Sequence, residues 1–360
     1  MRFKKEGKKK RHILLKAVVI MILAAAVLAA GDIVLNHAGS GYSDLSSKDQ
    51  SLLKEYDRYY KGIVKKPEFE GYSLAEKPVL LMLNGRTGRG YLVNPVNDVK
   101  SIFCQKIDMP SDFTINVYRV SRTDPDLIGM RTLESFNTPD MDRVYDESRY
   151  HVAGNNVYFV RYTENGSDSE LNDDHLTGFL AHEAFHYYMQ REWPGGGRYS
   201  ADLIGKEEIE GLSRKYDILT RMSEKMSGKN PDIQSLKKLA EEYVKNDKER
   251  ISESPELMKE ELAMETAEGS ARYVEGIALE IGGFTQTDMD YNKMMGLYRN
   301  GSISKDLFTS QVPYYAGAQL CRLMDLLGIK DWQKQLNAQT KSDPVTLYDI
   351  LEKYVTNVEK

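Results

Sequence analysis

The sequence predicts an α+β protein in which a small twisted β-sheet subdomain is followed by a mainly helical subdomain. Short β-branched and aromatic runs separated by turn residues fill residues 71–170. From residue 171 onward apolar residues recur mainly at helical spacing. A charge-free apolar segment precedes both regions. The predicted parts are a signal peptide or membrane anchor (1–36), a tether with a short helix (37–70), a β-rich subdomain (71–170) and a helical subdomain (171–360).

The first 36 residues resemble an export signal. Residues 1–16 carry eight Lys or Arg and one Glu, a net charge of +7, and Ala17–Gly31 has no charged residue. Positive charge before such a segment places the following chain outside the cytoplasm. Leu28–Gly31 offers small residues for cleavage, but flanking apolar residues can lengthen the run to a membrane span. We therefore expect an extracytoplasmic protein, either secreted or anchored to the cell membrane by an N-terminal helix.

Charge and cysteine content exclude some function classes. The whole chain of 360 residues has a net charge of −5, so the part after the basic start carries −12. A body this acidic argues against nucleic acid as a partner. The two cysteines, Cys104 and Cys321, can form one disulfide or stay as two buried thiols, and neither stands in a metal-ligand spacing.

The β-rich region contains several predicted strands. They cover Val79–Leu83, Tyr91–Val93, Ile102–Ile107, Phe113–Val120 and Asn156–Tyr162. Residues 84–90 between the first two strands predict a hairpin turn rather than a phosphate-binding loop, because no helix follows them. The polar residues 121–150 are expected to be irregular, either a flap over a cleft or a plain loop. The last strand is interpreted as the lip of a substrate cleft or as an ordinary edge strand.

Helices are expected in most of the C-terminal half. Their predicted ranges are 200–226, 232–249 and 255–281, followed by a mainly helical stretch from 303 to 360. The third of these begins at Ser254-Pro255-Glu256, because proline fits the first position of a helix. Gly282 and Gly283 provide its end.

The sequence His182-Glu183-x-x-His186 is the main chemical motif. Residues i and i+4 of a helix lie on one face, so both imidazoles can bind one Zn²⁺. Glu183 points into the same cavity and can take a proton from a metal-bound water. The flanks predict a helix that Asp173 or Asp174 caps and that the glycines after Pro194 end. His175 is expected at the start of this helix, and His151 has no assigned role.

A catalytic zinc ion requires three protein ligands, so a third is needed. In the predicted helix 255–281, Glu261, Glu265 and Glu268 share one face beside apolar positions. Such a row usually marks a solvated boundary. Beside a site with two histidines and no third ligand, however, one of these carboxylates can complete it. Glu265 and Glu268, one turn apart, both remain candidates.

Two further segments resemble a known family. Glu268–Glu275 resembles the Glu-Gly-x-Ala-x-Tyr-Val-Glu segment of the aminopeptidase N and leukotriene A4 hydrolase group of gluzincins. Val312–Ala318 is similar to the group's Val-Pro-Tyr-x-x-Gly-Ala/Phe segment. The resemblance implies a thermolysin-like catalytic subdomain with Glu268 as the third zinc ligand and Tyr314 as the group that stabilises the oxyanion. Glu275, with Arg272, is expected to orient the ligands.

The chain also departs from this family. Between His186 and Glu268 lie 81 residues, more than in the aminopeptidases, so the helices at about 200–250 are interpreted as an insertion that forms one wall of the cleft. The aminopeptidases bind the substrate's free amine through a Glu in a Gly-x-Met-Glu-Asn strand. The comparable segment here, Ala153–Val157, has no acidic residue. An endopeptidase is therefore favoured over an aminopeptidase.

The expected function is a zinc-dependent extracytoplasmic peptidase with one catalytic Zn²⁺ and a peptide or protein as substrate. Its ligands would be His182, His186 and Glu268, with Glu183 as the general base. One alternative is a catalytically inactive, gluzincin-like surface protein that binds a partner or a cell-wall component. Another is a zinc hydrolase with a non-peptide substrate, because zinc activation of water is not specific to amides.

Overall fold

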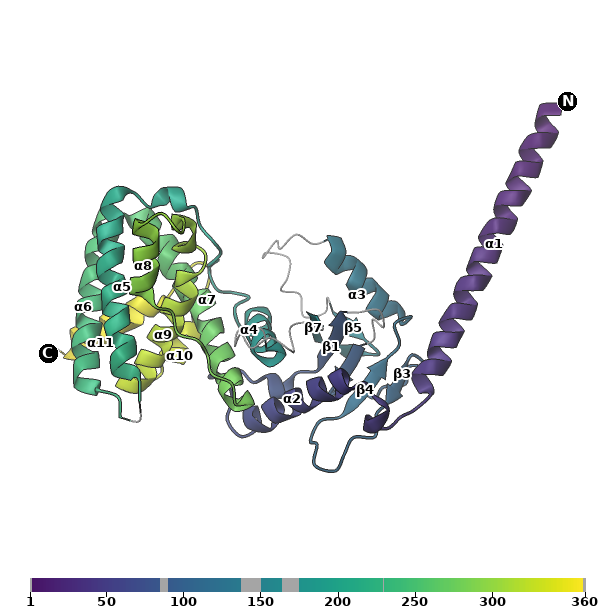
Figure 1. The fold of residues 1–360 in the computed structure, drawn as a ribbon, viewed down its shortest axis with the longest axis horizontal. Helices are drawn as coiled ribbons and strands as arrows, with labels where there is room; N and C mark the ends of the chain where they lie inside the picture. The colour runs from purple at the N-terminus through teal and green to yellow at the C-terminus, as the bar shows by residue number, and fades with distance from the viewer. Residues whose placement is uncertain (1, 85–89, 137–149, 164–174, 229, 359–360) are drawn as a thin grey trace. The chain divides into compact units, whose positions relative to one another are not determined.

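The computed structural model describes residues 2–84, 90–136, 150–163, 175–228 and 230–358 (Figure 1). The chain forms two compact units. The sheet unit consists of Met1–Asp57 and Glu76–Asn165, and the helical unit of Arg58–Ala75 and Gly166–Lys360. Helices and a small sheet are both present, as the α+β prediction requires. The segment Arg58–Ala75 belongs to the helical unit, whereas the predicted division placed residues 58–70 in the tether with its short helix and 71–75 in the β-rich subdomain.

The sheet unit is built on a five-stranded sheet with the order β3-β4-β2-β1-β7. Its strands are β1 (Val79–Asn84), β2 (Gly90–Val93), β3 (Cys104–Lys106), β4 (Val117–Val120) and β7 (Tyr158–Thr163). Neighbouring strands are antiparallel except for β1 and β7, which are parallel. Fully buried residues such as Leu80, Leu92 and Val117 form its core, since the strands bury their apolar side chains.

The predicted strands all take part in this sheet, with some differences. β1 and β2 pair as the predicted hairpin requires, and the turn itself lies outside the described residues. β4 begins only at Val117, because the Phe113 N–H turns back to the carbonyl of Pro110. β7 is an edge strand beside β1, and its role as the lip of a cleft stays a prediction.

The expectation that residues 121–150 are irregular is wrong for their first half. Helix α3 (Pro125–Phe136) begins after Asp124, whose carboxylate accepts a hydrogen bond from the Leu127 N–H at 3.0 Å. Proline at the first helical position and an aspartate before it favour this helix start. The possible flap at residues 137–149 lies outside the described residues. His151, in the short strand β5 (His151–Val152), lies 3.4 Å from Asp126.

The N-terminal helix α1 (Arg2–His37) includes a segment, Leu14–His37, that is long and apolar enough to cross a membrane. The segment after it was predicted to be a polar tether, but it packs on the sheet unit. Gly41 forms a bridge with Asp108, and the Tyr42 ring lies 5.0 Å from the ring of Phe113. These contacts hold the glycine- and serine-bearing stretch in place.

Helix α2 (Ser47–Ile63) is followed by the helices of the helical unit, which fall in the predicted regions except for Tyr291–Arg299, a helix that was not predicted from the sequence. These are α4 (Leu176–Met189), α5 (Lys206–Met226), α6 (Ile233–Glu253), α7 (Pro255–Gly282), α8 (Tyr291–Arg299), α9 (Val312–Leu327), α10 (Trp332–Asn337) and α11 (Leu347–Val358). The long helix α7 is central, because it packs against α4, α6, α9 and α11. Its ends follow the predicted signals, with Pro255 at the start and Gly283 in the left-handed conformation after the end.

Two glycines allow α7 and α9 to touch through their backbones. A Cβ atom on Gly269 would overlap the Cα atom of Gly317, and a Cβ on Gly317 would overlap the carbonyl oxygen of Glu265. Gly269 directly follows Glu268, and Gly317 lies three residues after Tyr314. The close approach therefore brings the two segments with family resemblance side by side.

Cys104 and Cys321 are both buried free thiols, so the disulfide considered from the sequence is not formed. They belong to different units. Burial raises the pKa of the Cys104 thiol to about 12. Each thiol therefore acts as a small apolar group in its core.

Candidate metal-binding and catalytic site

Helix α4 presents His182 and His186 toward α7. It starts after His175, whose ring stacks on Phe284, and the aspartates predicted as caps lie outside the described residues. The helix ends at Met189, before the glycines that were predicted to end it. The earlier end leaves Gln190 as the C-terminal cap residue, where its side chain can reach α7.

The two histidines and Glu268 bring three potential ligand atoms together. The Nε2 atoms of His182 and His186 are 3.1 Å apart. The Oε2 atom of Glu268 lies 3.2 Å from His186 Nε2 and 3.5 Å from His182 Nε2. All three residues are buried, with exposed fractions of 7%, 8% and 6%. These side chains form a group that can hold a metal ion, as the sequence predicted.

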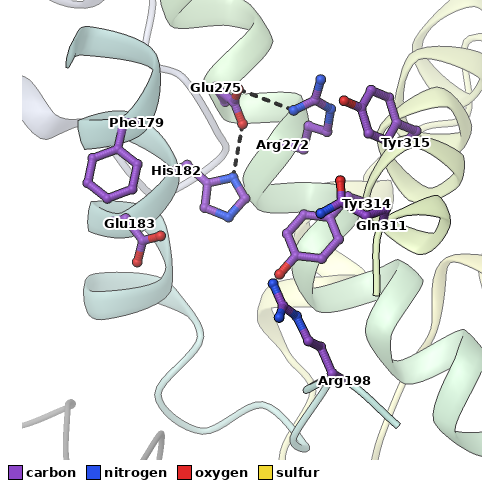
Figure 2. A pocket seen from close by; sticks show the side chains of 9 residues that line it. All are labelled: Phe179, His182, Glu183, Arg198, Arg272, Glu275, Gln311, Tyr314 and Tyr315. Carbon is purple, nitrogen blue, oxygen red and sulfur yellow. Dashed lines mark hydrogen bonds and ion pairs between the residues drawn. The ribbon is translucent and has the colours of Figure 1, made fainter. Parts of the chain in front are cut away.

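The outer nitrogen of His182 is held by α7. Its Nδ1 atom lies 3.1 Å from Oε2 of Glu275, and Oε1 of Glu275 is 3.3 Å from Nη1 of Arg272 (Figure 2). The Arg272 guanidinium in turn lies 3.8 Å from the ring centre of Tyr315. Glu275 and Arg272 thus occupy the positions in which they were expected to orient the ligands.

The outer nitrogen of His186 is held by Gln190, which the sequence reasoning missed. The amide nitrogen of Gln190 donates to the Ala267 carbonyl at 2.7 Å and to Ser270 Oγ at 3.0 Å. Its oxygen therefore faces His186 Nδ1, at 2.6 Å, and accepts a hydrogen bond from it. The other ring nitrogen of His186, Nε2, faces Glu268. The signal was present in the sequence, because Gln190 follows His186 by one helical turn.

The alternative ligand Glu265 faces away from the histidines. Its carboxylate lies 2.6 Å from Lys215 Nζ and accepts a hydrogen bond from the Tyr243 hydroxyl at 3.0 Å. Lys215 and Tyr243 belong to α5 and α6, the helices of the predicted insertion. Between the two candidates from the sequence, the structure therefore brings Glu268 to the histidines.

The electrostatics of this group favour a positive charge. Burial by itself would lower the pKa of His182, but hydrogen bonds to Glu268 and Glu275 outweigh it and raise this pKa to about 10. Burial likewise opposes the charge on Glu268, yet hydrogen bonds with His182 and His186 lower its pKa below the usual range. A carboxylate that stays ionised beside two imidazoles provides a binding site for a cation.

A cleft of about 350 Å³ opens beside this group (Figure 2). Its lining residues are Phe179, His182, Glu183, Arg198, Arg272, Glu275, Gln311, Tyr314 and Tyr315. They come from α4, α7, the start of α9 and the loop after α4. The insertion was predicted to form a wall of the cleft, but none of these residues comes from α5 or α6; α6 instead packs against α7, and α5 packs against α6, α8 and α9.

Glu183 and Tyr314 both face the cleft, as predicted. The rings of Tyr314 and His182 are nearly parallel, at 9°, with centres 5.9 Å apart. Burial and the nearby charge of Glu268 raise the pKa of Tyr314, so its hydroxyl remains a hydrogen-bond donor. The exposed Arg198 lies near this hydroxyl, and no motif in the sequence indicated it.

No family model, curated protein or solved structure matches the chain. The functional interpretation consequently depends on the geometry of this site and on the three short motifs that form it. Each motif contributes one side of the cleft, from α4, α7 and α9.

Proposed function

We propose that this chain is an extracytoplasmic, zinc-dependent peptidase of the gluzincin type with a thermolysin-like catalytic subdomain. The observation that carries the proposal is the spacing of His182, His186 and Glu268. Zinc binds histidine nitrogen and carboxylate oxygen at about 2.0–2.2 Å in tetrahedral geometry, which places two ligand atoms about 3.3–3.6 Å apart. The three separations of 3.1, 3.2 and 3.5 Å are close to this range.

The surroundings of the ligands support zinc in a second way. Metal-binding histidines usually donate their other ring N–H to a carboxylate, a carbonyl or a comparable acceptor, which fixes the ring and its tautomer. Glu275 provides this acceptor for His182, and Gln190 provides it for His186. Three protein ligands leave a fourth position free, which is the arrangement of catalytic rather than structural zinc sites.

The remaining residues of the cleft suit hydrolysis. When bound, zinc supplies a Lewis acid that lowers the pKa of a water molecule to near neutrality. Glu183, half-buried in the cleft, is suited to accept the proton of the attacking water and to deliver it to the leaving amine. The Tyr314 hydroxyl is suited to donate a hydrogen bond to the oxyanion that develops on the scissile carbonyl.

The charges in the cleft favour an endopeptidase over an aminopeptidase. An aminopeptidase needs a carboxylate to bind the substrate's ammonium group. Of the two carboxylates that line this cleft, Glu275 is engaged by His182 and Arg272, and Glu183 is assigned to proton transfer. The exposed guanidinium of Arg198 would repel a free ammonium group.

Metal analysis and a matched pair of variants test the proposal. The full chain in detergent, after zinc addition and dialysis, should contain about one zinc per molecule by plasma mass spectrometry. Glu268→Gln should lose most of this zinc, whereas Glu265→Gln, one turn earlier, should retain it. Glu183→Gln should keep its zinc and lose about 10²–10⁴-fold in peptide hydrolysis, because only the base is removed.

Three results would contradict the proposal. A folded wild-type chain that binds no zinc would exclude a zinc peptidase. Full zinc with equal turnover in wild type and Glu183→Gln would exclude the assigned base. A zinc-loaded protein with no hydrolysis of any peptide in a broad library would favour the alternative of a binding protein with a gluzincin-like site.

A further inference from the structure

The C-terminal end of helix α1 is buried in the sheet unit, although the preceding apolar part is exposed. Leu14, Val27 and Leu28 have exposed fractions of 66–71%, as a lipid-facing helix would. Asp32 and Asn36, one turn apart on the same helix, are only 3% and 0% exposed. The burial therefore begins abruptly, at the first charged residue after the apolar run.

Asn36 is held by the backbone and by an arginine of the sheet. Its amide nitrogen donates to the carbonyl oxygens of Phe103 at 3.0 Å and Arg119 at 3.1 Å. The buried guanidinium of Arg119 donates to the Asn36 side chain, to the Asn36 carbonyl and to the Gly39 carbonyl at 2.8 Å. Arg119, in β4, thus caps the carbonyl end of α1, where a cation is favourable.

Asp32 adds a second attachment one turn earlier. Its carboxylate accepts a hydrogen bond from Ser121 Oγ and lies 2.9 Å from Nε of Arg122. A buried carboxylate without such partners would be costly, so these contacts specify where the helix meets the sheet unit. The last two turns of α1 are therefore part of the folded sheet unit and do not act as a flexible leader.

The length of the exposed part matches a bilayer. Leu14–Gly31 has 18 residues, which at about 1.5 Å per residue extend about 27 Å. The hydrocarbon core of a membrane is about 30 Å thick. The basic residues before Leu14 would remain on the cytoplasmic side. The outer edge of the bilayer then falls beside Asp32, with no linker between the membrane and the sheet unit.

We propose that α1 is retained as a membrane anchor and that the contacts of Asp32 and Asn36 fix the sheet unit directly on the outer membrane surface. The bilayer is also the partner for exposed apolar residues at this end of the helix. Val34 and Leu35 are 68% and 59% exposed, and Ile102, next to Phe103, is 66% exposed. These three residues, which we call the collar, would lie at the level of the lipid headgroups. This attachment to the membrane requires neither zinc nor hydrolysis.

The same geometry opposes removal of the helix. The small residues at Leu28–Gly31 that offer a cleavage site lie inside α1, directly before the docked Asp32. Proteases commonly bind their substrates as extended strands. Cleavage would therefore require the helix to unwind next to a segment that the sheet unit holds in place.

Intact mass and membrane extraction test retention of the helix. The full chain, expressed with its own N-terminus in a bacterial host, should be recovered from membranes with residues 1–31 present and should resist extraction by alkaline carbonate. A soluble protein whose first residue lies near Gly31 would overturn the proposal. A chain that keeps residues 1–31 but is released by carbonate would overturn it as well.

The docking is tested with a spin label at Ile102→Cys in proteoliposomes of the otherwise native chain. The native thiols are buried, so the added cysteine reacts selectively. For each label we compare the collision rate with oxygen, which enters the bilayer, to that with a water-soluble nickel chelate. This ratio should be at least threefold higher at Ile102→Cys than at the exposed reference Lys238→Cys. Equal oxygen-to-nickel collision ratios at the two positions would show that the collar does not lie at the membrane.

Variants at Asn36 and Ile102 distinguish attachment of α1 to the sheet unit from simple insertion of this helix into the membrane. Asn36→Ala should expose the junction around residues 31–45 to protease at least tenfold more than wild type, and the adjacent exposed variant His37→Ala should not. If Asn36→Ala does not fold, Ile102→Asp tests the same surface, because it should weaken the oxygen contact of a label at Leu35→Cys. If residues 31–45 of a folded Asn36→Ala chain resist protease as well as those of wild type, the proposed attachment of α1 to the sheet unit is wrong.

Discussion

Helix α7 carries two sets of buried carboxylates that have different partners. Glu261 and Glu265 face the insertion, where Lys215 Nζ lies 2.7 Å and 2.6 Å from them. Glu268 and Glu275, one to three turns later, face α4, where each meets a histidine. The first set lies against the cations of Lys215 and Arg250, whereas the second set lies against the imidazoles of His182 and His186, with Arg272 beside Glu275.

The difference separates a structural cluster from a binding site. Around Lys215 and Arg250 the carboxylates are balanced by permanently charged groups in a region without solvent access. Around Glu268 the carboxylate lies beside two histidine nitrogens and a cleft. Among the described residues, the Glu268 carboxylate contacts the two histidines, and a carboxylate in such a setting is suited to bind an external ion.

The largest effect on stability is expected at Lys215. Lys215→Met would leave Glu261, Glu265 and Asp247 buried with Arg250 as the remaining cation, and breaking a buried ion pair costs about 3–5 kcal/mol. Urea denaturation should show a loss of this size both with and without zinc. Lys248→Met, which removes an exposed pair with Glu352, should cost about 1 kcal/mol or less. A similar loss in the two variants would show that the buried cluster around Lys215 contributes no more to stability than an exposed ion pair.

The next largest effect on stability is expected at Gly317, where the backbone of α9 touches that of α7 beside both sets of carboxylates. Gly317→Ala would push a methyl group into the Glu265 carbonyl and should destabilise the protein by about 3 kcal/mol, since neither backbone can yield easily. It should also weaken zinc binding, because α9 would move away from Glu268. Gly296→Ala, in a helix with open space around the new methyl group, should be neutral or stabilising by up to about 1 kcal/mol. Thermal unfolding with and without zinc measures both effects, and equal behaviour of the two variants would contradict the close contact.

The next prediction concerns the pH dependence that Glu265, in the first set, contributes to stability. Burial and the charge of Glu261 raise the pKa of Glu265 above its usual value, despite Lys215. A carboxyl group whose pKa is raised in the folded state favours folding fully only below its unfolded pKa of about 4.5, and this contribution is lost as the pH rises through the folded value. The stability of wild type relative to Glu265→Gln should therefore fall by about 2 kcal/mol between pH 4.5 and 8. Urea denaturation across this range tests it, and a rising difference would show that Glu265 is stabilised as a carboxylate.

The parts of the fold and site that were predictable depend on local pattern. The spacing of His182 and His186 and the capping signals of α7 concern residues a few positions apart, and these predictions agree with the structure. Glu268 was distinguishable from Glu265 only through a resemblance to a family. In the structure the choice follows from Lys215, which approaches from another helix and has no local signature. The helix α3 was missed although Asp124 and Pro125 marked its start.

The smallest effect is expected at Gln190, which links the histidine-bearing helix α4 to α7. Gln190→Met removes the acceptor for His186 Nδ1 and should weaken zinc binding about 10–100-fold, because such outer partners fix the orientation of a ligand. The matched control is Gln319→Met, since Gln319 is equally buried and donates to the Leu219 carbonyl at 2.7 Å on α5. Both variants lose a buried hydrogen bond and should lose comparable stability, about 1–3 kcal/mol. Competition titration with a chelator should show weakened zinc affinity in Gln190→Met alone; equal affinities in the two variants would assign Gln190 a purely structural role.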